Sequence, residues 1–209
     1  IQYADYAAWQ RGWLQGAVLQ EQIAYWHTQL ADAPPLLSLP TSHARPAEPT
    51  YQAATLPFTI AAPVVAQLQS LAQAHGATLY MAVLSTFALL LARYSGQPDL
   101  VIGTPIANRT HPAIEGLIGF FVNTLALRID LHGAPSFVEL LQRVRQTTLA
   151  AYAHQDAPFE QVIEALHLPR NRSHAPLCQV LLAWQAMTEQ PTAVNLPDLA
   201  LQPVAWHKP

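Results

Sequence analysis

The sequence predicts an α+β fold in which helices pack on a mixed β-sheet. Segments with the apolar spacing of amphipathic helices alternate with short, turn-bounded runs rich in β-branched residues, in the order α, β, α, α, β, β, α, α, β, β. Hydrophobic residues make up 51% of the 209 residues and charged residues 11%. This composition excludes intrinsic disorder and allows a buried core, with some apolar surface left for a partner.

The N-terminal part predicts two helices followed by a connector. Over residues 3–31, apolar side chains recur at a 4-3-4 spacing that lines one helix face: Leu19, Ile23, Trp26 and Leu30. Gly16 is expected to divide this stretch into two helices. Residues 33–49 contain five prolines. Because proline lacks a backbone donor, this stretch is predicted to be an extended surface connector or a domain linker.

The next elements are a strand and two helices. Residues 52–60 are expected to form a strand, and Pro63 suits the first turn of the helix that follows. Thr78 is the predicted N-cap of the helix over 79–94, which is apolar on nearly every face. We therefore expect a fully buried central helix that ends at Gly96.

Two further helices are predicted from their first turns. Ser136 and Glu139 have the spacing of a capping box before a helix to about residue 153. Asp156 as N-cap and Pro158 in the first turn predict the last helix. The remaining strands are expected at 100–103, 122–131, 179–184 and 199–206.

Charge and cysteine content narrow the function. Ten Lys and Arg against 13 Asp and Glu give a net charge of −3, without the basic block that nucleic-acid binding needs. No apolar run is long enough to span a membrane. Cys178 is the single cysteine, which excludes a disulfide framework and fits the cytoplasm. The chain begins at Ile1 without signal-peptide features and is interpreted as a piece of a longer protein.

No standard catalytic or metal motif is found. The nine histidines never fall at metal-ligand spacing, so no metal site is expected. The sequence has no glycine-rich phosphate loop and no Gly-x-Ser-x-Gly elbow. Cys178 precedes an apolar run and is interpreted as a core thiol.

Three polar clusters stand out from the apolar sequence around them. In residues 119–124, Asn123 lies at the entry of a hydrophobic strand and needs partners if it is buried; the alternative is a turn asparagine. Residues 154–160 are polar where a helix begins, and their alternative interpretation is helix capping. Residues 170–177 are a polar loop that leads into a strand.

Together these clusters resemble the condensation domain of nonribosomal peptide synthetases. A Tyr-x-Asp-Tyr-Ala-x-Trp-Gln motif of that family is matched by Tyr3, Asp5, Tyr6, Ala7, Trp9 and Gln10. Its Ile-Gly-x-Phe-Val-Asn-Thr motif is similar to residues 118–124. Its His-Gln-Asp-x-Pro-Phe-Glu motif is matched in full by His154, Gln155, Asp156, Pro158, Phe159 and Glu160. The connecting residues 103–109, which end at Arg109, also resemble the family.

A fourth family motif is matched in part. Four of its residues agree: Arg170, Ser173, Pro176 and Leu177. Three others replace the commoner Asp, Arg and Asn: Asn171, His174 and Ala175. This departure makes the loop a poor guide to substrate choice.

The resemblance implies a fold similar to chloramphenicol acetyltransferase, built from two lobes with a His-His-x-x-x-Asp-Gly active-site motif in the first. That motif does not occur in this sequence. Residues 1–209 are therefore expected to be a C-terminal lobe, a two-layer α+β sandwich that would pack against an N-terminal lobe. No catalytic residue is expected in this chain, which we expect to be inactive alone.

The family reaction is amide formation, in which the amine of a carrier-tethered aminoacyl group attacks the thioester of an upstream peptidyl carrier. The resemblance implies an amide-forming acyltransferase, a ligase or transferase of natural product biosynthesis. Expected partners are the N-terminal lobe, the upstream and downstream carrier domains and an adjacent adenylation domain. No cofactor is expected on this chain, because the phosphopantetheine belongs to the carriers.

The resemblance assigns site roles. Gly119, Asn123 and Ser173 are candidates for the wall of the substrate tunnel, where Gly119 would permit close backbone approach and Asn123 would offer hydrogen bonds. The expected interlobe or structural residues are Tyr3, Asp5, Tyr6, Trp9, Arg109, His154, Gln155, Asp156, Pro158, Phe159 and Arg170. Asp156 and Glu160 are interpreted as helix N-terminal charges rather than general bases.

Three alternatives stay open at this point. The first is a self-sufficient acyltransferase, and the second is a non-catalytic condensation-like module that recruits other proteins. The third is a relative of epimerisation or heterocyclisation domains. An isolated C-terminal lobe is expected to expose its apolar interlobe face, which would favour association with other molecules.

Overall fold

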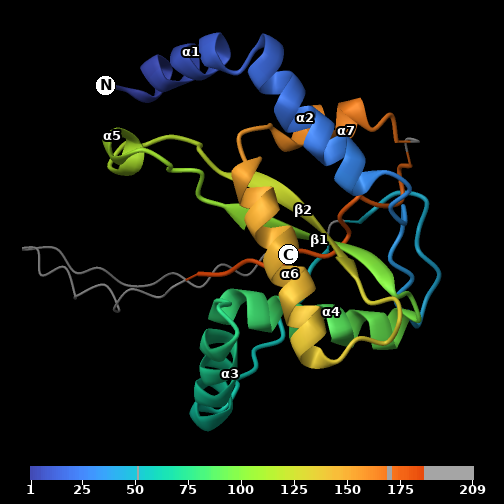
Figure 1. Cartoon of the computed structure of the whole chain (residues 1–209). Helices are drawn as coiled ribbons and strands as arrows, with labels where there is room; N and C mark the ends of the chain where they lie inside the picture. Colours follow the sequence, from blue (N-terminus) through green and yellow to red (C-terminus); the bar gives the residue numbers. More distant parts are fainter. Residues whose placement is uncertain (51, 169–170, 186–209) are drawn as a thin grey trace, which may run out of the picture.

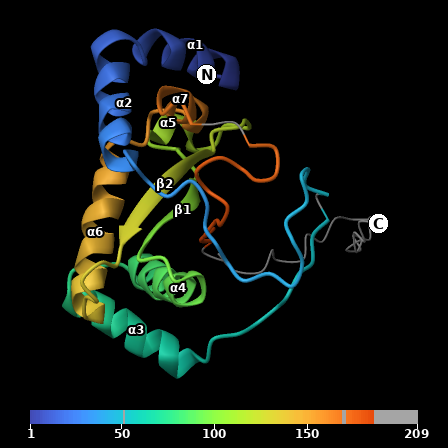
Figure 2. The same cartoon turned by 90° about the vertical axis from the view of Figure 1, so that its right-hand side faces the viewer.

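The computed structural model describes residues 1–50, 52–168 and 171–185. In this part of the chain, helices surround a small antiparallel sheet, so the predicted α+β class is confirmed (Figures 1 and 2). The helices are α1 (Tyr3–Trp13), α2 (Gly16–Leu30), α3 (Ala62–Ala74), α4 (Leu79–Ser95), α5 (Pro112–Glu115), α6 (Phe137–Ala153) and α7 (Phe159–Ala165). The strands are β1 (Asp99–Ile106) and β2 (Asn123–Asp130).

The sheet is built on the antiparallel pair β1–β2, whose register runs from Asp99 opposite Asp130 to Ile106 opposite Asn123. Residues 180–182 lie along the other edge of β1 as an isolated parallel bridge. The Gly103 N–H donates to Val180 O at 3.0 Å. A Cβ at Gly103 would collide with the Leu181 side chain, so glycine permits this close approach. The expected strand over 179–184 is thus reduced to this bridge.

The core lies between the sheet and two long helices. α6 packs against β2, and α4 packs against both α6 and β1 (Figure 1). The largest fully buried side chains come from these four elements and include Leu84, Ile102, Leu127, Leu141 and Val144. The strands are buried in continuous runs, at residues 100–104 and 125–127, and pack with the apolar faces of α4 and α6 in one hydrophobic core.

The helix ends follow the predicted capping residues in two places. The Thr78 side chain accepts from the Met81 N–H at 3.2 Å, and Gly96 ends α4 with a φ of 72°. At α6, Ser136 and Glu139 form the predicted capping box. The prediction was wrong for α7: the helix begins at Phe159, after Pro158 in the N-cap position, and Asp156 caps nothing. The extended backbone of Pro158 (ψ 136°) starts the helix later than the sequence pattern indicates.

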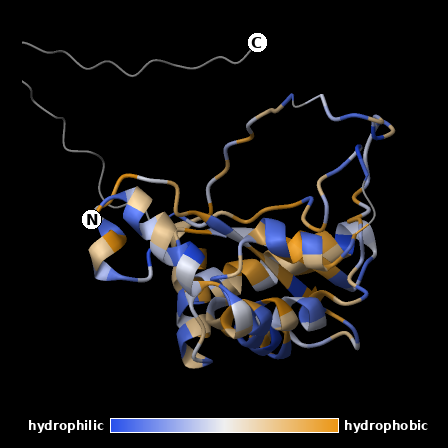
Figure 3. Ribbon diagram, turned by 90° about the horizontal axis from the view of Figure 1, so that it is seen from above, coloured by the Kyte–Doolittle hydropathy of each residue, from blue (hydrophilic) through white to orange (hydrophobic). Residues whose placement is uncertain are grey.

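Two further expectations were wrong, one about the burial of α4 and one about a strand over residues 52–60. α4 is buried on one face only, and Leu90 and Tyr94 on its other face are exposed. Residues 52–60 form no strand, because no other described segment offers them backbone partners. Leu56 and Phe58 of this segment are 86% and 83% exposed. Hydrophobic residues thus lie in outlying segments as well as in the core elements (Figure 3).

Other predictions have mixed outcomes. The break near Gly16 is confirmed, since α1 ends at Trp13 and α2 begins at Gly16. The short helix α5 was not predicted. The strand expected over 199–206 lies outside the described residues. No single described helix is long and apolar enough to cross a membrane; α3 and α4 reach that length only as a pair bent by 107°. The cytoplasmic location stays a prediction.

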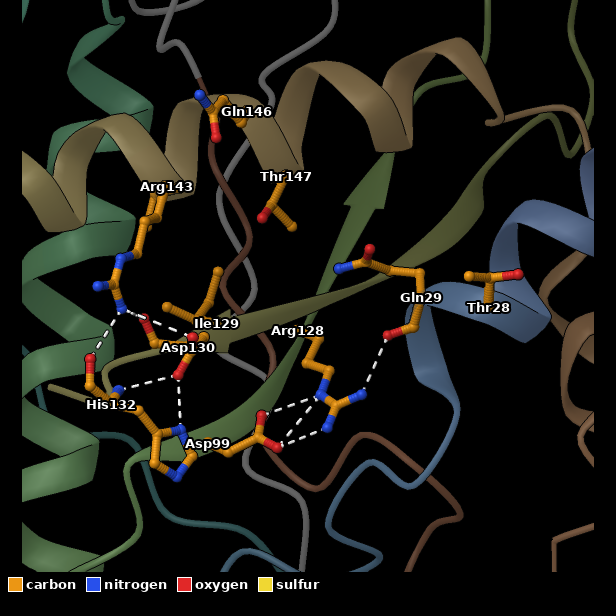
Figure 4. A pocket seen from close by; sticks show the side chains of 11 residues that line it. Thr28, Gln29, Asp99, Arg128, Ile129, Asp130, His132, Arg143, Gln146 and Thr147 are labelled. Atoms are coloured by element: carbon orange, nitrogen blue, oxygen red, sulfur yellow. Dashed lines mark hydrogen bonds and ion pairs between the residues drawn. The ribbon is translucent and has the colours of Figure 1, made fainter.

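An ion-pair network fastens the Asp99–Asp130 end of the β-ladder to its neighbours (Figure 4). The Arg128 guanidinium bonds the Asp99 carboxylate at 2.7 Å and donates to Ala31 O at 2.6 Å, at the C-terminal end of α2. Hydrogen bonding to Asp99 raises the pKa of Arg128 further above its ordinary value. A cation at this helix end also complements the α2 dipole. Arg128 therefore ties β1, β2 and α2 together.

We expect Arg128→Ala to lower the free energy of unfolding by about 1–3 kcal/mol, because a charged hydrogen-bond pair and two helix-end contacts are lost. Urea unfolding followed by circular dichroism measures this change. Arg93→Ala is the control, since Arg93 is exposed and its side chain makes no hydrogen bond or ion pair with the described residues. Equal effects of the two substitutions would contradict the anchoring role of Arg128.

Candidate functional site

The sequence motifs at residues 3–10, 118–124 and 154–160 meet beside the start of β2. They enclose a pocket of about 210 Å³, here called the motif pocket. Its lining residues are Tyr6, Gln10, Asn108, residues 120–124, Asp156, Pro158, Phe159 and Glu160. Side chains separated by up to about 150 positions in sequence thus share one small cavity.

Asn123, the first residue of β2, connects two of these motifs. Its Nδ2 donates to the carbonyl oxygens of Gln155 at 2.9 Å and Ala157 at 2.8 Å. Its Oδ1 accepts from the N–H groups of Thr124 at 2.9 Å and Phe159 at 3.1 Å. The amide therefore uses both of its hydrogens and both lone pairs of its oxygen on the backbone.

This geometry gives Asn123 a positioning function. The loop that leads to α7 is held against the start of β2, and the N–H of Phe159, which lacks an intrahelical acceptor, is satisfied. The half-buried asparagine has the hydrogen-bond partners that the sequence analysis required of a buried one. Its amide has no free donor for a substrate in this arrangement, so a direct tunnel contact by Asn123 stays a prediction.

An aromatic cluster joins α1 to the segment before β2. The ring of buried Phe121 contacts Tyr3 edge-on, with centroids 5.1 Å apart, and Tyr6 at 4.8 Å. Arg109 covers Phe121 with its guanidinium carbon 4.3 Å from the ring centroid, and donates to Glu115 O at 3.1 Å. These contacts are cation–π and aromatic pairs of ordinary geometry.

Gly119 is required by Tyr3. The Tyr3 hydroxyl donates to Phe120 O at 2.8 Å, and its ring lies directly over Gly119. A Cβ on Gly119 would lie 2.7 Å from Tyr3 Cγ, closer than real side chains approach. In the described structure the close approach at Gly119 is therefore made by a tyrosine ring. Approach of a substrate to this backbone stays a prediction.

His154 connects α6 to α2. Its Nδ1 lies 2.8 Å from Ala150 O, and its carbonyl oxygen accepts from Trp26 Nε1 at 2.8 Å. The imidazole stacks on Tyr25 with centroids 3.9 Å apart. These contacts place His154 between two helices, away from any arrangement for proton transfer among the described residues.

The remaining α1 residues have local roles. The Asp5 carboxylate accepts from the Gln2 N–H at 2.8 Å and so caps α1. Trp9 and Trp13 stack in parallel at 5.2 Å and are 56% and 39% exposed. The predicted placement of Trp9 in an interlobe seam is not tested by these contacts. Its exposed ring is available to a partner.

Asp156 is the more buried of the two carboxylate residues, Asp156 and Glu160, that line the motif pocket. It is half-buried, and burial raises its pKa. Burial also raises the pKa of Tyr6, and the charge of Asp156 adds to that increase. Among the described residues, no hydrogen bond or ion pair reaches the Asp156 carboxylate.

The fourth motif lies apart from the motif pocket. Ser173 donates through its N–H and its hydroxyl to Asn171 Oδ1, both at 2.8 Å. Neither residue lines the motif pocket. Arg170 lies outside the described residues. Cys178 is buried, and burial raises its pKa to about 12, which fits the expected core thiol.

Several lining residues were not among the predicted site residues, including the polar side chains of Gln10, Asn108 and Thr124. Asn108 has a positive φ of 51°, a conformation that asparagine tolerates. No single-sequence signal separates such a residue from an ordinary turn asparagine. In the described ranges, no group of three His, Cys, Asp or Glu side chains is placed to hold a metal ion.

We expect Asn123→Ala to lower the free energy of unfolding by about 1–3 kcal/mol, since four part-buried backbone groups lose their hydrogen-bond partner. Urea unfolding measures this loss, with exposed Gln20→Ala on α2 as the control. An effect of Asn123→Ala no larger than that of the control would contradict the positioning function.

A double-mutant cycle tests the contact between Gly119 and Tyr3. Gly119→Ala should cost about 1–3 kcal/mol in the wild-type background through overpacking. The same substitution should cost little in Tyr3→Ala, because the obstructing ring is absent. Thermal or urea unfolding of the four proteins gives the coupling. Additive effects would show that another neighbour, rather than Tyr3, requires glycine.

Comparisons with known proteins agree with the motifs. The family model described as Condensation domain matches residues 1–208. The chain is 53% identical over 203 residues to malpinin synthetase of Mortierella alpina, covering 97% of this chain and 3% of that protein. It is 51% identical over 185 residues to a linear gramicidin synthase of Brevibacillus parabrevis, covering 88% of this chain and 2% of that protein.

Comparison with solved structures indicates the same family as the sequence comparisons. The X-domain from teicoplanin biosynthesis has a TM-score of 0.81 and 35% identity, covering 87% of this chain and 41% of the X-domain chain. A four-domain nonribosomal peptide synthetase bound to AMP and glycine has a TM-score of 0.77 and 32% identity, covering 79% of this chain and 13% of that synthetase chain. This chain thus spans a small part of the curated relatives it matches. By sequence and by fold, it belongs to the condensation-domain family of nonribosomal peptide synthetases.

Proposed function

We propose that this chain is the C-terminal lobe of a condensation domain that forms the amide bond in nonribosomal peptide synthesis. The attacking amine of a carrier-tethered aminoacyl group would form the C–N bond, and the upstream carrier's thiol would leave as the thioester breaks. The lobe would supply one wall of the substrate tunnel. The catalytic histidine motif would lie in the N-terminal lobe, outside this sequence.

The observation that carries this proposal is the convergence of three motif segments on one face. Asn123 fastens residues 154–159 to β2, and Tyr3 fastens α1 to the segment 117–122. The sequence between Gly119 and Asn123 thereby becomes a fixed wall rather than a loose loop. Three motifs that are far apart in sequence thus form one continuous surface, as the wall of a substrate tunnel would require.

An exposed ridge lies beside this wall. Ile118, Phe120 and Val122 are 97%, 78% and 49% exposed, while Phe121 between them is buried. This alternation is typical of an extended segment with one face packed and one face free. Three exposed apolar side chains in a row indicate a surface that is covered by a partner. We propose the N-terminal lobe as that partner.

The remaining assignments follow the same proposal. Gly119, Asn123 and Ser173 are proposed for the tunnel wall, with Asn123 acting through the loop that it holds. Upstream and downstream carrier domains would bring the substrates on phosphopantetheine, so no cofactor is proposed on this chain. An adjacent adenylation domain would load a carrier, and the whole assembly would work in the cytoplasm.

The experiment uses the parent protein and measures amide formation between loaded donor and acceptor carriers. Phe120→Ala should reduce the rate by about tenfold or more, because the ridge would pack at the lobe interface that positions both substrates. In the 209-residue chain the same substitution should leave the urea midpoint unchanged, since the side chain is 78% exposed there.

Leu149→Ala, also at an exposed apolar position but on α6, is the control and should retain the rate. Full condensation activity of the Phe120→Ala parent would contradict the proposed wall. No amide formation by the wild-type parent with any loaded carrier pair would contradict the proposed activity itself.

A further inference from the structure

The motif pocket combines aromatic walls with two carboxylates that have no described partner, half-buried Asp156 and exposed Glu160. Asp156 lines it together with Tyr6, Phe120 and Phe159, and no lysine or arginine is among its lining residues. In the described structure the carboxylate receives no hydrogen bond and no ion pair. Half-buried carboxylates without a partner lose hydration and gain nothing in return. The pocket lining therefore carries negative charge that no positive side chain among the lining residues balances.

The fold holds this carboxylate in place despite that cost. The two carbonyl groups bonded by Asn123 Nδ2 belong to Gln155 and Ala157, the neighbours of Asp156 on either side. A single amide thus clamps the backbone on both sides of the acid. Asp156 is not a helix cap, so capping does not explain its position. A rigidly held, uncompensated acid is typical of a binding group.

The walls restrict the kind of ligand. Aromatic faces carry negative quadrupole charge and attract cations, and a carboxylate attracts them further. Phe121, which also lines the pocket, already binds a cation in this way, since the Arg109 guanidinium lies over its ring. An anion would meet Asp156 and the exposed Glu160 without a positive group among the lining residues. A neutral apolar group would leave the carboxylate unpaired.

We propose that the motif pocket holds a cationic nitrogen, an ammonium or a guanidinium, against Asp156. The cation has two sources: the protonated amine of a substrate, or a Lys or Arg side chain from another part of the parent protein. The first source rests on the proposed function, whereas the second needs only a neighbouring lobe. A pocket of about 210 Å³ accommodates either group.

The binding test uses the 209-residue chain and methylammonium chloride, with acetamide as a neutral probe of similar size. Titration followed by NMR should shift the backbone signals of Asp156, Phe159 and Tyr6 with methylammonium and leave them unchanged with acetamide. Asp156→Asn should weaken methylammonium binding by about tenfold, because a charge-assisted contact is lost while the side-chain size is kept.

Glu21→Gln, which removes an exposed charge on α2, is the matched control and should leave binding unchanged. If the Asp156→Asn variant does not fold, shown by its loss of dispersed NMR signals, Tyr6→Ala replaces it and should weaken binding through loss of one aromatic wall. Equal binding by wild type and a folded Asp156→Asn chain overturns the proposal, as does the absence of saturable shifts at these residues.

The parent protein distinguishes the two sources. If a Lys or Arg of another segment fills the pocket, methylammonium will not shift these signals in the parent, and Asp156→Asn will destabilise the parent more than the 209-residue chain. If the substrate amine fills it, the parent will bind methylammonium, and Asp156→Asn will raise the KM for the acceptor. The binding test does not require condensation, so a failed proposed function and a failed cation pocket give different results.

Discussion

One side-chain amide supports the arrangement of the candidate site. Asn123 makes four hydrogen bonds to backbone groups, and three of these join β2 to residues 155–159. Backbone groups in a half-buried loop need partners, and neither a strand nor a helix supplies them here. The asparagine provides both donors and acceptors from one position. The loop, the first turn of α7 and the Asp156 side chain all take their positions from it.

Other contacts hold the two ends of the β-ladder in place against the helices. At the end opposite Asn123, Arg128 joins Asp99 to the last carbonyl groups of α2. Between the two ends, α4 and α6 bury the strands' apolar side chains. Hydrophobic burial supplies most of the driving force, while the polar groups at the two ends select the geometry. The site therefore lies where hydrophobic packing alone would not fix the conformation of the chain.

Sequence reasoning succeeded where the cause is local. The caps at Thr78 and Ser136 depend on residues within one helical turn. The strands β1 and β2 were predicted from short β-branched runs bounded by turns. It failed where the deciding contact is distant in sequence or where the described residues offer no partner. Residues 52–60 have the pattern of a strand but no described neighbour to pair with. Asp156 has the spacing of a cap, but Asn123, 36 residues before Phe159, supplies the missing acceptor instead.

The candidate site could be predicted only in part, because its contacts also join residues that are distant in sequence. The motif resemblance selected Asn123, Gly119 and Asp156 without indicating what each contacts. Only the folded chain shows that Gly119 accommodates the ring of Tyr3 and that Asn123 bonds the two neighbours of Asp156. Gln10 and Asn108 lie in segments that resemble the family, but the sequence does not show that they line a pocket, because that pocket is formed together with other segments.

Amide hydrogen exchange of Phe159 is the most direct measurement of the Asn123 clamp. The N–H groups in the first turn of a helix have no intrahelical acceptor and exchange readily in the native state. Because Asn123 Oδ1 accepts from Phe159, this N–H should be protected, while that of Glu160 in the same turn should exchange rapidly. Equally rapid exchange at Phe159 and Glu160 would contradict the clamp.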